Sequence, residues 1–189
     1  MSDTYHHGNL RRAILERATA IITEQGVEAL SLRAVAAELN VSHAAPRHHF
    51  SSKKALITAI AADGFTELAD RIEQARDDGF LGAGLAYVAF AAAQPAAFEV
   101  MFTPTLLDTE DPQLAQAASR SLELLRTGAS RHNGEGDATA LAGWAMAHGL
   151  AALLRSGGLV QTGFLSESED PLVVAESALR MLVGPTVEH

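Results

Sequence analysis

Apolar residues recur three and four positions apart over most of the chain, which is the spacing of one buried face of an α-helix. The first run follows Asn9, which we expect to be its N-cap, and Gly26 is expected to end it. Three further runs follow Ser31, Ser42 and Ser52, and each serine is placed to cap the helix behind it. The helices expected in this part of the chain span about 9–25, 31–39, 42–50 and 52–76.

Proline and glycine divide the rest of the chain into further helices. Pro95 suits the first turn of a helix, and Gly157 is expected to stop a long one. The Gly-Pro pair at 184–185 is expected to end the last helix. The helices expected here span about 81–93, 96–102, 111–131, 137–156 and 170–183. The pattern therefore predicts an all-α fold of about nine helices.

The composition agrees with a helical chain. Of the 189 residues, 48% are hydrophobic and only 5% aromatic, and alanine, the best helix former, dominates the apolar content. The chain has no cysteine and its first ten residues lack the apolar stretch of an export signal, so we expect a cytoplasmic protein. The uncharged run 79–98 is long enough to span a bilayer. We expect it to be a buried core or interface helix, with no membrane contact.

Charge is distributed unevenly along the chain. The net charge of −9 argues at first against nucleic acid. Residues 1–60, however, carry seven Lys and Arg against five Asp and Glu, together with five of the eight histidines. Residues 61–189 carry seven Arg against eighteen Asp and Glu. This asymmetry predicts a small neutral-to-basic head on an acidic body.

Residues 31–50, SLRAVAAELNVSHAAPRHHF, have the layout of a helix-turn-helix. A short amphipathic helix with Leu32, Val35 and Leu39 on its apolar face is followed by Asn40, which tolerates the left-handed conformation of a tight turn. A second short helix follows. In this motif the first helix crosses the DNA backbone and the second enters the major groove, so the pattern indicates a DNA-binding head.

The sequence around this motif resembles the TetR family of transcriptional regulators over about residues 5–65. The matching features are the Leu32-Arg33-x-Val35-Ala36 helix, the Val41-Ser42 turn, His49, and the pattern Phe50-x-x-Lys53-x-x-Leu56. The stretch YHHGNLR at 5–11 and the later Trp144-x-x-x-His148-Gly149 are similar to one branch of that family. The resemblance implies an N-terminal three-helix helix-turn-helix DNA-binding domain over about 1–52. It also implies a larger helical domain over about 53–189 for ligand binding and dimerisation.

Nine residues of the head are candidates for contact with double-stranded operator DNA. Those at the N-terminal end of the second motif helix are placed to reach base edges: Ser42, His43, Ala44 and Ala45. The others are placed for phosphates: Ser31, Arg33, Arg47, His48 and Lys53. Arg47 stands where most family members carry tyrosine and adds a charge, while Pro46 removes a backbone donor near the start of the helix. For the two histidines, a solvated surface side chain is the alternative.

The body is expected to hold a cavity for an unidentified small-molecule effector. The larger side chains expected to line it are Phe90, Phe98, Met101, Phe102, Trp144, Met146 and His148. For each of them, simple core filling is the alternative. The helices at 137–156 and 170–183 are apolar on more than one face, which predicts a homodimer with a four-helix interface. Such a regulator is expected to act as a repressor that its ligand releases from DNA.

Other function classes have weaker support. The histidines lack the i, i+4 pairing with an acidic partner that a metal site needs, and the catalytic and phosphate-binding motifs GxSxG, GxGxxG and the P-loop are missing. We therefore expect no enzyme activity, no metal and no cofactor. A helical protein-interaction module and an enzyme that does not bind DNA are the alternatives. Salt-dependent retention of DNA distinguishes the regulator from both.

Overall fold

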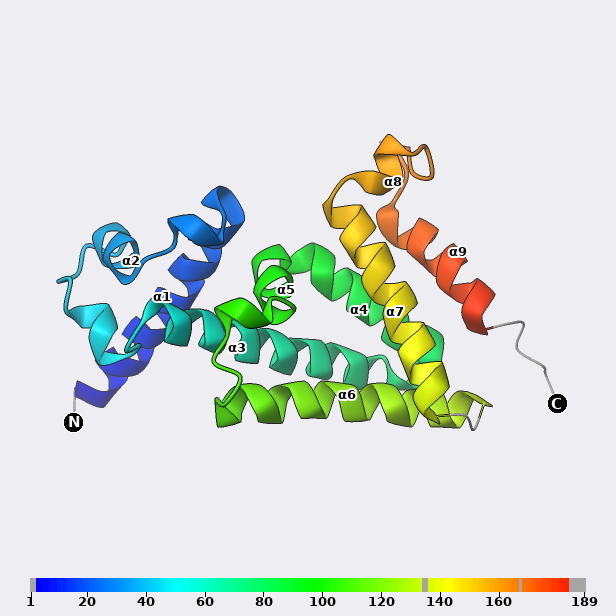
Figure 1. Cartoon of the computed structure of the whole chain (residues 1–189), viewed down its shortest axis with the longest axis horizontal. Coiled ribbons are helices and arrows are strands. Elements are labelled where there is room, and N and C mark those ends of the chain that lie inside the picture. The colour runs from blue at the N-terminus through cyan, green and yellow to red at the C-terminus, as the bar shows by residue number, and fades with distance from the viewer. Residues whose placement is uncertain (1–2, 134–135, 167, 184–189) are drawn as a thin grey trace. The chain divides into compact units, whose positions relative to one another are not determined.

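The computed structural model describes residues 3–133, 136–166 and 168–183, and every regular element in these ranges is a helix (Figure 1). The α-helices are α1 (Asp3–Gln25), α2 (Leu32–Glu38), α3 (Lys53–Gln74), α4 (Gly79–Ala93), α5 (Pro95–Met101), α6 (Pro112–Asn133), α7 (Gly136–Arg155), α8 (Gly158–Gln161) and α9 (Pro171–Val183). Four 3₁₀ turns complete the described set: η1 (Val27–Ala29), η2 (Ala45–His48), η3 (Arg76–Asp78) and η4 (Pro104–Leu106). The all-α prediction is confirmed. The expected stop at 184–185 lies outside the described residues.

Local hydrogen bonds in the structure confirm where two of the predicted helices begin. Ser31 Oγ accepts from Ala34 N at 3.0 Å, and Ser52 Oγ accepts from Ala55 N at 3.0 Å, so both serines are N-caps. Asn40 has φ 53°, which is the left-handed conformation expected of the tight turn. These features depend on neighbouring residues alone and are confirmed.

The prediction of Asn9 as an N-cap is wrong, because α1 already begins at Asp3. The residues before Asn9 include no proline, and a single glycine costs a helix interior only about 1 kcal/mol. The local signal was therefore too weak to mark a boundary. A short helix that was not predicted, α8, follows Gly157, whose φ of 71° ends α7 as expected.

The second motif helix, predicted over 42–50, is a single 3₁₀ turn, η2. Ser42 contributes its carbonyl oxygen, which accepts from Ala45 N at 2.9 Å, and Arg47 N donates to Ala44 O at 3.0 Å. Pro46 accounts for the shortening, because it has no N–H and disfavours helical geometry at the residue before it. Pro46 is fully buried, so it also anchors the turn.

The Cα positions divide into two compact units: Met1–Gly64 with Ala96–Ala115, and Phe65–Pro95 with Gln116–His189. The core of the first unit contains fully buried apolar side chains from α1, α2, α3 and the residue that follows η1, namely Ile14, Ile21, Val35, Leu56, Ile57 and Leu30. The loop before α6 is fastened to this unit, because Asp108 N donates to Thr58 Oγ1 at 2.9 Å. The core thereby holds the helix-turn-helix segment on the start of α3.

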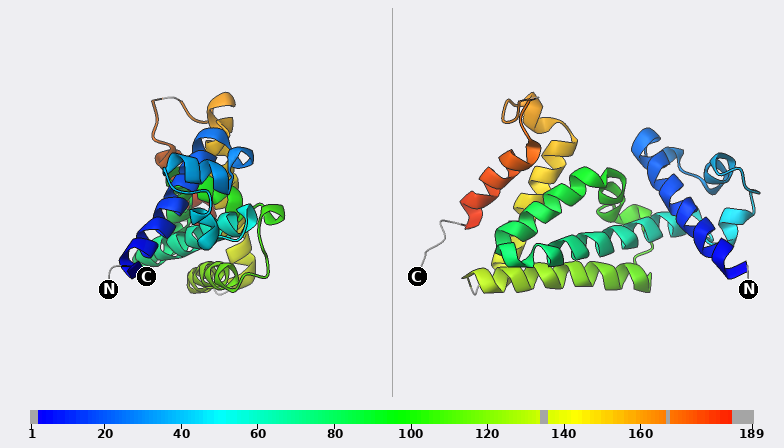
Figure 2. Two further views of the ribbon diagram at one scale, coloured as in Figure 1. Left: turned by 90° about the vertical axis from the view of Figure 1, so that its left-hand side faces the viewer. Right: turned by 180° about the vertical axis from the view of Figure 1, so that it is seen from behind.

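In the second unit α4 packs against α7 and α9 (Figure 1). The part of α3 that belongs to this unit runs beside α6 (Figure 2), and Ser121 Oγ donates to Phe65 O at 2.9 Å between them. The Phe80 ring of α4 is buried against Ala129 of α6 and Ala140 of α7. It lies so close to α7 that a methyl group at Gly143 would overlap its ring. Glycine at this position therefore lets α4 and α7 approach.

We expect Gly143→Ala to lower the free energy of unfolding by about 1–2 kcal/mol. Overpacking a core costs about 1–3 kcal/mol, which exceeds the gain of up to about 1 kcal/mol from alanine in a helix. Gly128→Ala in α6 is the matched control, because a methyl group there would lie 3.8 Å from the same ring, at ordinary contact distance. It should stabilise by about 0.5–1 kcal/mol. Urea unfolding measures both changes, and equal effects of the two variants would contradict this packing.

Among the described residues, no single helix has both the length and the hydropathy needed to cross a bilayer. The segment 76–93, which includes α4, has the required length and hydropathy only when it is counted together with α5, and the two are separated by a sharp bend.

Candidate functional sites

A cleft of about 380 Å³ lies in the first unit, on the helix-turn-helix segment. Its lining consists of Ser31, Leu32, Arg33, His43, Arg47 and Lys53. Five of these six are residues that the sequence marks as candidates for DNA contact. They come from the start of α2, from the turn around η2 and from the first residue of α3. The fold thus brings together side chains up to 22 positions apart in the sequence.

The elements around the cleft fix where its charges lie. Leu32 and Pro46 are buried, so α2 and η2 each have one side in the core and the opposite side in solvent. Arg33 and Arg47 are exposed on those outer sides. Lys53 is half-buried, and its Nζ donates to Glu28 O at 3.4 Å, a long hydrogen bond that leaves two ammonium protons for another acceptor. Three cationic side chains therefore face one concave surface.

Electrostatically this cleft suits an anion. Of its six described lining residues, three carry a positive charge and none is acidic. The other predicted contact residues do not line it: Ser42, Ala44 and His48 are exposed beside it and Ala45 is half-buried. Phosphate oxygens accept hydrogen bonds from guanidinium and ammonium groups, so the backbone of a nucleic acid is chemically matched to the surface.

A hydrogen-bonded polar cluster lies in the second unit between α4 and α7. Trp144 Nε1 donates to Tyr87 Oη at 3.2 Å, and Tyr87 Oη lies 2.8 Å from His148 Nδ1. Sequence reasoning selected Trp144 and His148 and missed Tyr87. The sequence did carry a signal for Tyr87, which is a phenol within the uncharged run 79–98. A buried hydroxyl needs a hydrogen-bond partner, so a polar partner for Tyr87 could have been expected.

The direction of the Trp144–Tyr87 hydrogen bond follows from the groups involved. An indole N–H can only donate, so Tyr87 Oη accepts from Trp144. Burial raises the pKa of Tyr87, against a smaller lowering by the Trp144 hydrogen bond, so the phenol keeps its proton. Between Tyr87 Oη and His148 Nδ1 the histidine tautomer decides the donor, because the phenol donates to an unprotonated Nδ1 and accepts from a protonated one. Burial also lowers the pKa of His148, which agrees with a neutral imidazole at this position.

We expect the free energy of unfolding to fall as pH is lowered from about 7.5 to about 5, partly through His148. Because burial depresses its pKa in the folded state, the unfolded chain binds this proton at a higher pH. The contribution is present above the ordinary histidine pKa and is lost as pH falls below it. In His148→Gln the pH slope of the urea midpoint should be smaller than in the wild-type protein. An unchanged slope in His148→Gln would refute this role.

The remaining predicted cavity residues are distributed over both units. Phe98, Met101 and Phe102 belong to the first unit, where the rings of Phe98 and Phe102 form an edge-on pair with centroids 5.3 Å apart. Phe90 and Met146 belong to the second unit, and Phe90 is fully buried. A single effector cavity shared by all seven predicted residues stays a prediction.

Comparison with known proteins gives matches over both parts of the chain. Residues 14–60 match the family described as "Bacterial regulatory proteins, tetR family". Residues 80–182, more than half of the chain, match "Tetracyclin repressor-like, C-terminal domain". The chain is 35% identical over 65 residues to the HTH-type transcriptional regulator Rv1816 of Mycobacterium tuberculosis (strain ATCC 25618 / H37Rv). That similarity covers 34% of this chain and 28% of the length of the relative.

Solved structures resemble the chain over nearly its whole length. A protein of unknown function from Rhodococcus sp. RHA1 is 30% identical, with a TM-score of 0.76 over 96% of this chain and 97% of that one. AibR, in a complex with isovaleryl coenzyme A and operator DNA, is 18% identical, with a TM-score of 0.68 over 93% of this chain and 98% of that one. The AibR similarity concerns the fold alone. With both family matches, these findings show that the chain belongs to the tetR family of bacterial regulatory proteins.

Proposed function

We propose that the protein is a transcriptional regulator that binds operator DNA through its N-terminal helix-turn-helix. The observation that carries the proposal is the cleft on that motif, where Arg33, Arg47 and Lys53 converge without an acidic neighbour in the described lining. The head is close to neutral while residues 61–189 carry a net charge of −11, so attraction to phosphate depends on this local cluster.

Within this proposal the contact residues have two roles. Ser31, Arg33, Arg47, His48 and Lys53 contact phosphates and position the head on the duplex. Ser42, His43, Ala44 and Ala45 are placed for base edges, where alanine methyl groups suit thymine and histidine suits a base acceptor. The turn before η2 and the first residue of η2 present them in place of a full recognition helix. The DNA-binding domain is proposed to cover about 1–52 and the ligand-binding and dimerisation domain about 53–189.

A mobility-shift assay on the promoter region of its own gene, repeated over a range of salt concentrations, tests this proposal. The logarithm of the binding constant should fall linearly with the logarithm of salt concentration, because bound phosphates release counterions. A flat salt dependence, or no shift at any salt concentration, would favour the helical interaction module or the enzyme in place of a regulator.

We also propose that the protein acts as a homodimer through α7 and α9. Among the described residues, these helices carry large apolar side chains that the single chain leaves in solvent. Leu141 on α7 is 62% exposed, and Val173 and Met181 on α9 are 59% and 84% exposed. Val173, Ser177 and Met181 recur every four positions, so they form one stripe. A second copy would cover both helices in a four-helix interface and present two heads to successive major grooves, about 34–36 Å or a multiple apart.

The proposed regulation is release of a repressor by a small molecule in the cytoplasm of a bacterial cell. AibR has this fold and is seen with both an acyl coenzyme A and operator DNA, which supports an effector site in the body of such a protein. The cluster of Trp144, Tyr87 and His148 supplies polar groups within an apolar region, as effector sites require. The Trp-x-x-x-His-Gly spacing assigns the chain, in our proposal, to the branch of the family with that type of ligand domain.

A further inference from the structure

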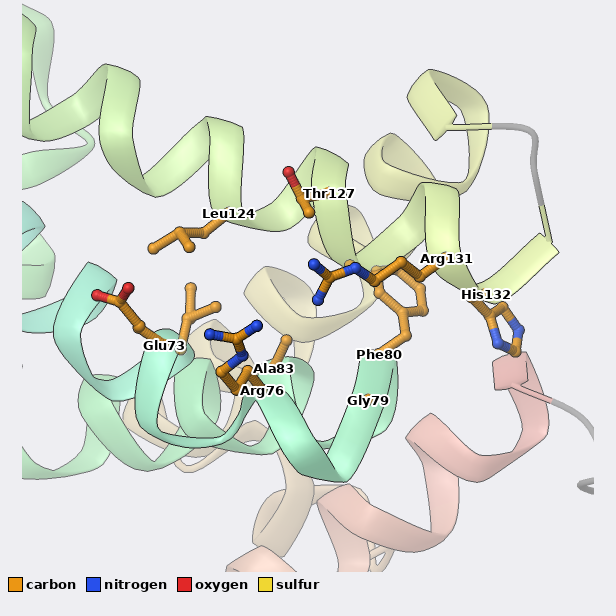
Figure 3. Close-up of a pocket in the computed structure, with 11 residues that line it drawn as sticks. Glu73, Arg76, Gly79, Phe80, Ala83, Leu124, Thr127, Arg131 and His132 are labelled. Atoms are coloured by element: carbon orange, nitrogen blue, oxygen red, sulfur yellow. The ribbon is translucent and has the colours of Figure 1, made fainter.

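A second cleft of about 380 Å³ lies within the second unit, and none of the predicted effector residues lines it. It is bounded by the last turn of α3, by η3, by the start of α4 and by the C-terminal half of α6 (Figure 3). Glu73 and Arg76 lie on one side, and Arg131 lies on α6 on the other. In Figure 3 the guanidinium groups of Arg76 and Arg131 extend into the space between these elements.

These two arginines differ from the other cations of the unit. Residues 65–95 and 116–189 contain seven arginines and no lysine. Five of the seven have an ion-pair or hydrogen-bond partner: Arg71 with Glu67, Arg120 with Asp70 and Glu73, Arg126 with Asp137, Arg155 with the Pro95 carbonyl, and Arg180 with Glu176. Among the described residues, Arg76 and Arg131 alone in this unit have none, and both line the same cleft.

The acidic side chain in the cleft does not neutralise them. Glu73 is held by Arg120, with Nη2 and Oε2 2.5 Å apart, and Arg120 also binds Asp70 at 2.6 Å. Asp70 and Glu73 of α3 are thus both paired with a cation that does not line the cleft. Two guanidinium groups remain on one concave surface of an otherwise acidic body, and an anion between them would remove their mutual repulsion.

The wall behind these charges is apolar and well supported. Ile72 and Ala83 are buried, and the Phe80 ring stacks on His132 with centroids 5.7 Å apart. Gly128 leaves the α6 side open, since a methyl group there would only just touch Phe80. The cleft therefore combines an apolar surface with two guanidinium groups that can bind an anion. Its volume is at the small end of the range for ligand sites.

We propose that this cleft binds a small organic anion whose carboxylate lies between Arg76 and Arg131 and whose apolar body packs on Phe80. Each guanidinium group can bind a carboxylate through two parallel N–H···O hydrogen bonds, and this geometry fixes the orientation of the carboxylate. The cleft includes the last turn of α3, and the first residue of the same helix is Lys53 of the DNA-contact cleft. Any effect of the anion on DNA binding travels through this helix and rests on the proposed function, whereas binding itself does not.

The test measures binding by calorimetry and thermal shift with benzoate, phenylacetate, hexanoate and octanoate. The neutral amides of the same four bodies, acetate and inorganic phosphate serve as comparisons. At least one of the four carboxylates should bind, and its amide and the two small anions should bind at least about tenfold more weakly, because they lack the charge or the apolar body. Failure of all four carboxylates at millimolar concentration, or equal binding of acid and amide, overturns the proposal.

Variants locate the bound anion. Arg76→Gln and Arg131→Gln should each weaken it by about tenfold or more, and Gly128→Met should block it by filling the cleft. Arg126→Gln is the matched control, because Arg126 lies on the same helix but is paired with Asp137 outside the cleft. Wild-type affinity in both cleft arginine variants overturns the assignment. The mobility-shift assay is run separately, so loss of the DNA-binding proposal and loss of the anion site give different results.

Discussion

Arg47→Ala is expected to weaken binding to operator DNA by about 100-fold. Each subunit of the proposed dimer loses one charge-assisted contact to phosphate, and such contacts contribute about 1.5–3 kcal/mol each. Two lost contacts therefore cost at least about 3 kcal/mol, and each 1.4 kcal/mol corresponds to about a tenfold change in affinity. The slope of affinity against salt should decrease by about two, because two fewer phosphates are neutralised.

The control for this result is Arg126→Ala, which removes an exposed arginine of the second unit that lines neither cleft and should leave operator affinity unchanged. His43→Ala provides a contrast of another kind, since a base contact changes the preference among operator sequences with little effect on the salt slope. Should Arg47→Ala retain both the wild-type affinity and the wild-type slope, the cleft would not be the phosphate-binding surface.

The double variant Leu141→Glu, Val173→Glu is expected to be monomeric at micromolar concentration. Both side chains are largely exposed in the single chain, so the substitutions should leave its core intact. In the proposed interface they would place four uncompensated carboxylates in a desolvated surface, at several kcal/mol for each ion. The dimer dissociation constant should rise by at least about 1000-fold, and operator affinity should fall because two heads no longer act together.

Light scattering measures the mass and the mobility shift measures the loss of operator binding. Leu122→Glu is the matched control, because Leu122 is also an exposed leucine but lies on α6. A double variant that remains dimeric would exclude α7 and α9 as the interface. A monomeric wild-type protein would exclude the dimer itself.

The features that could be predicted from the sequence depend on near neighbours along the chain. The capping hydroxyls of Ser31 and Ser52 and the left-handed Asn40 each act over three or four residues. Pro46 is visible in the sequence as a missing backbone donor, but in the structure the segment is shortened to the single turn η2.

The parts that could not be predicted depend on partners far apart in the sequence. The phenol of Tyr87 meets Trp144 and His148 about sixty residues later, and no local pattern marks that pairing. Within the described part of the second unit, the lack of a partner for Arg76 and Arg131 becomes visible only in the fold, where the other five arginines have theirs. Charge counts along a chain show how many cations are present, whereas only the fold shows which of them remain unpaired.

The hydrogen-bonded indole of Trp144 also gives the protein an internal optical probe. Trp144 is the chain's single tryptophan, so the tryptophan emission of the whole molecule comes from one ring. That ring is 37% exposed on α7, and its N–H is bound to Tyr87. Coverage of α7 by a second copy would move its emission to shorter wavelength, and a charged His148 nearby would quench it. Subunit association and the protonation of the cluster can therefore be followed without an added label.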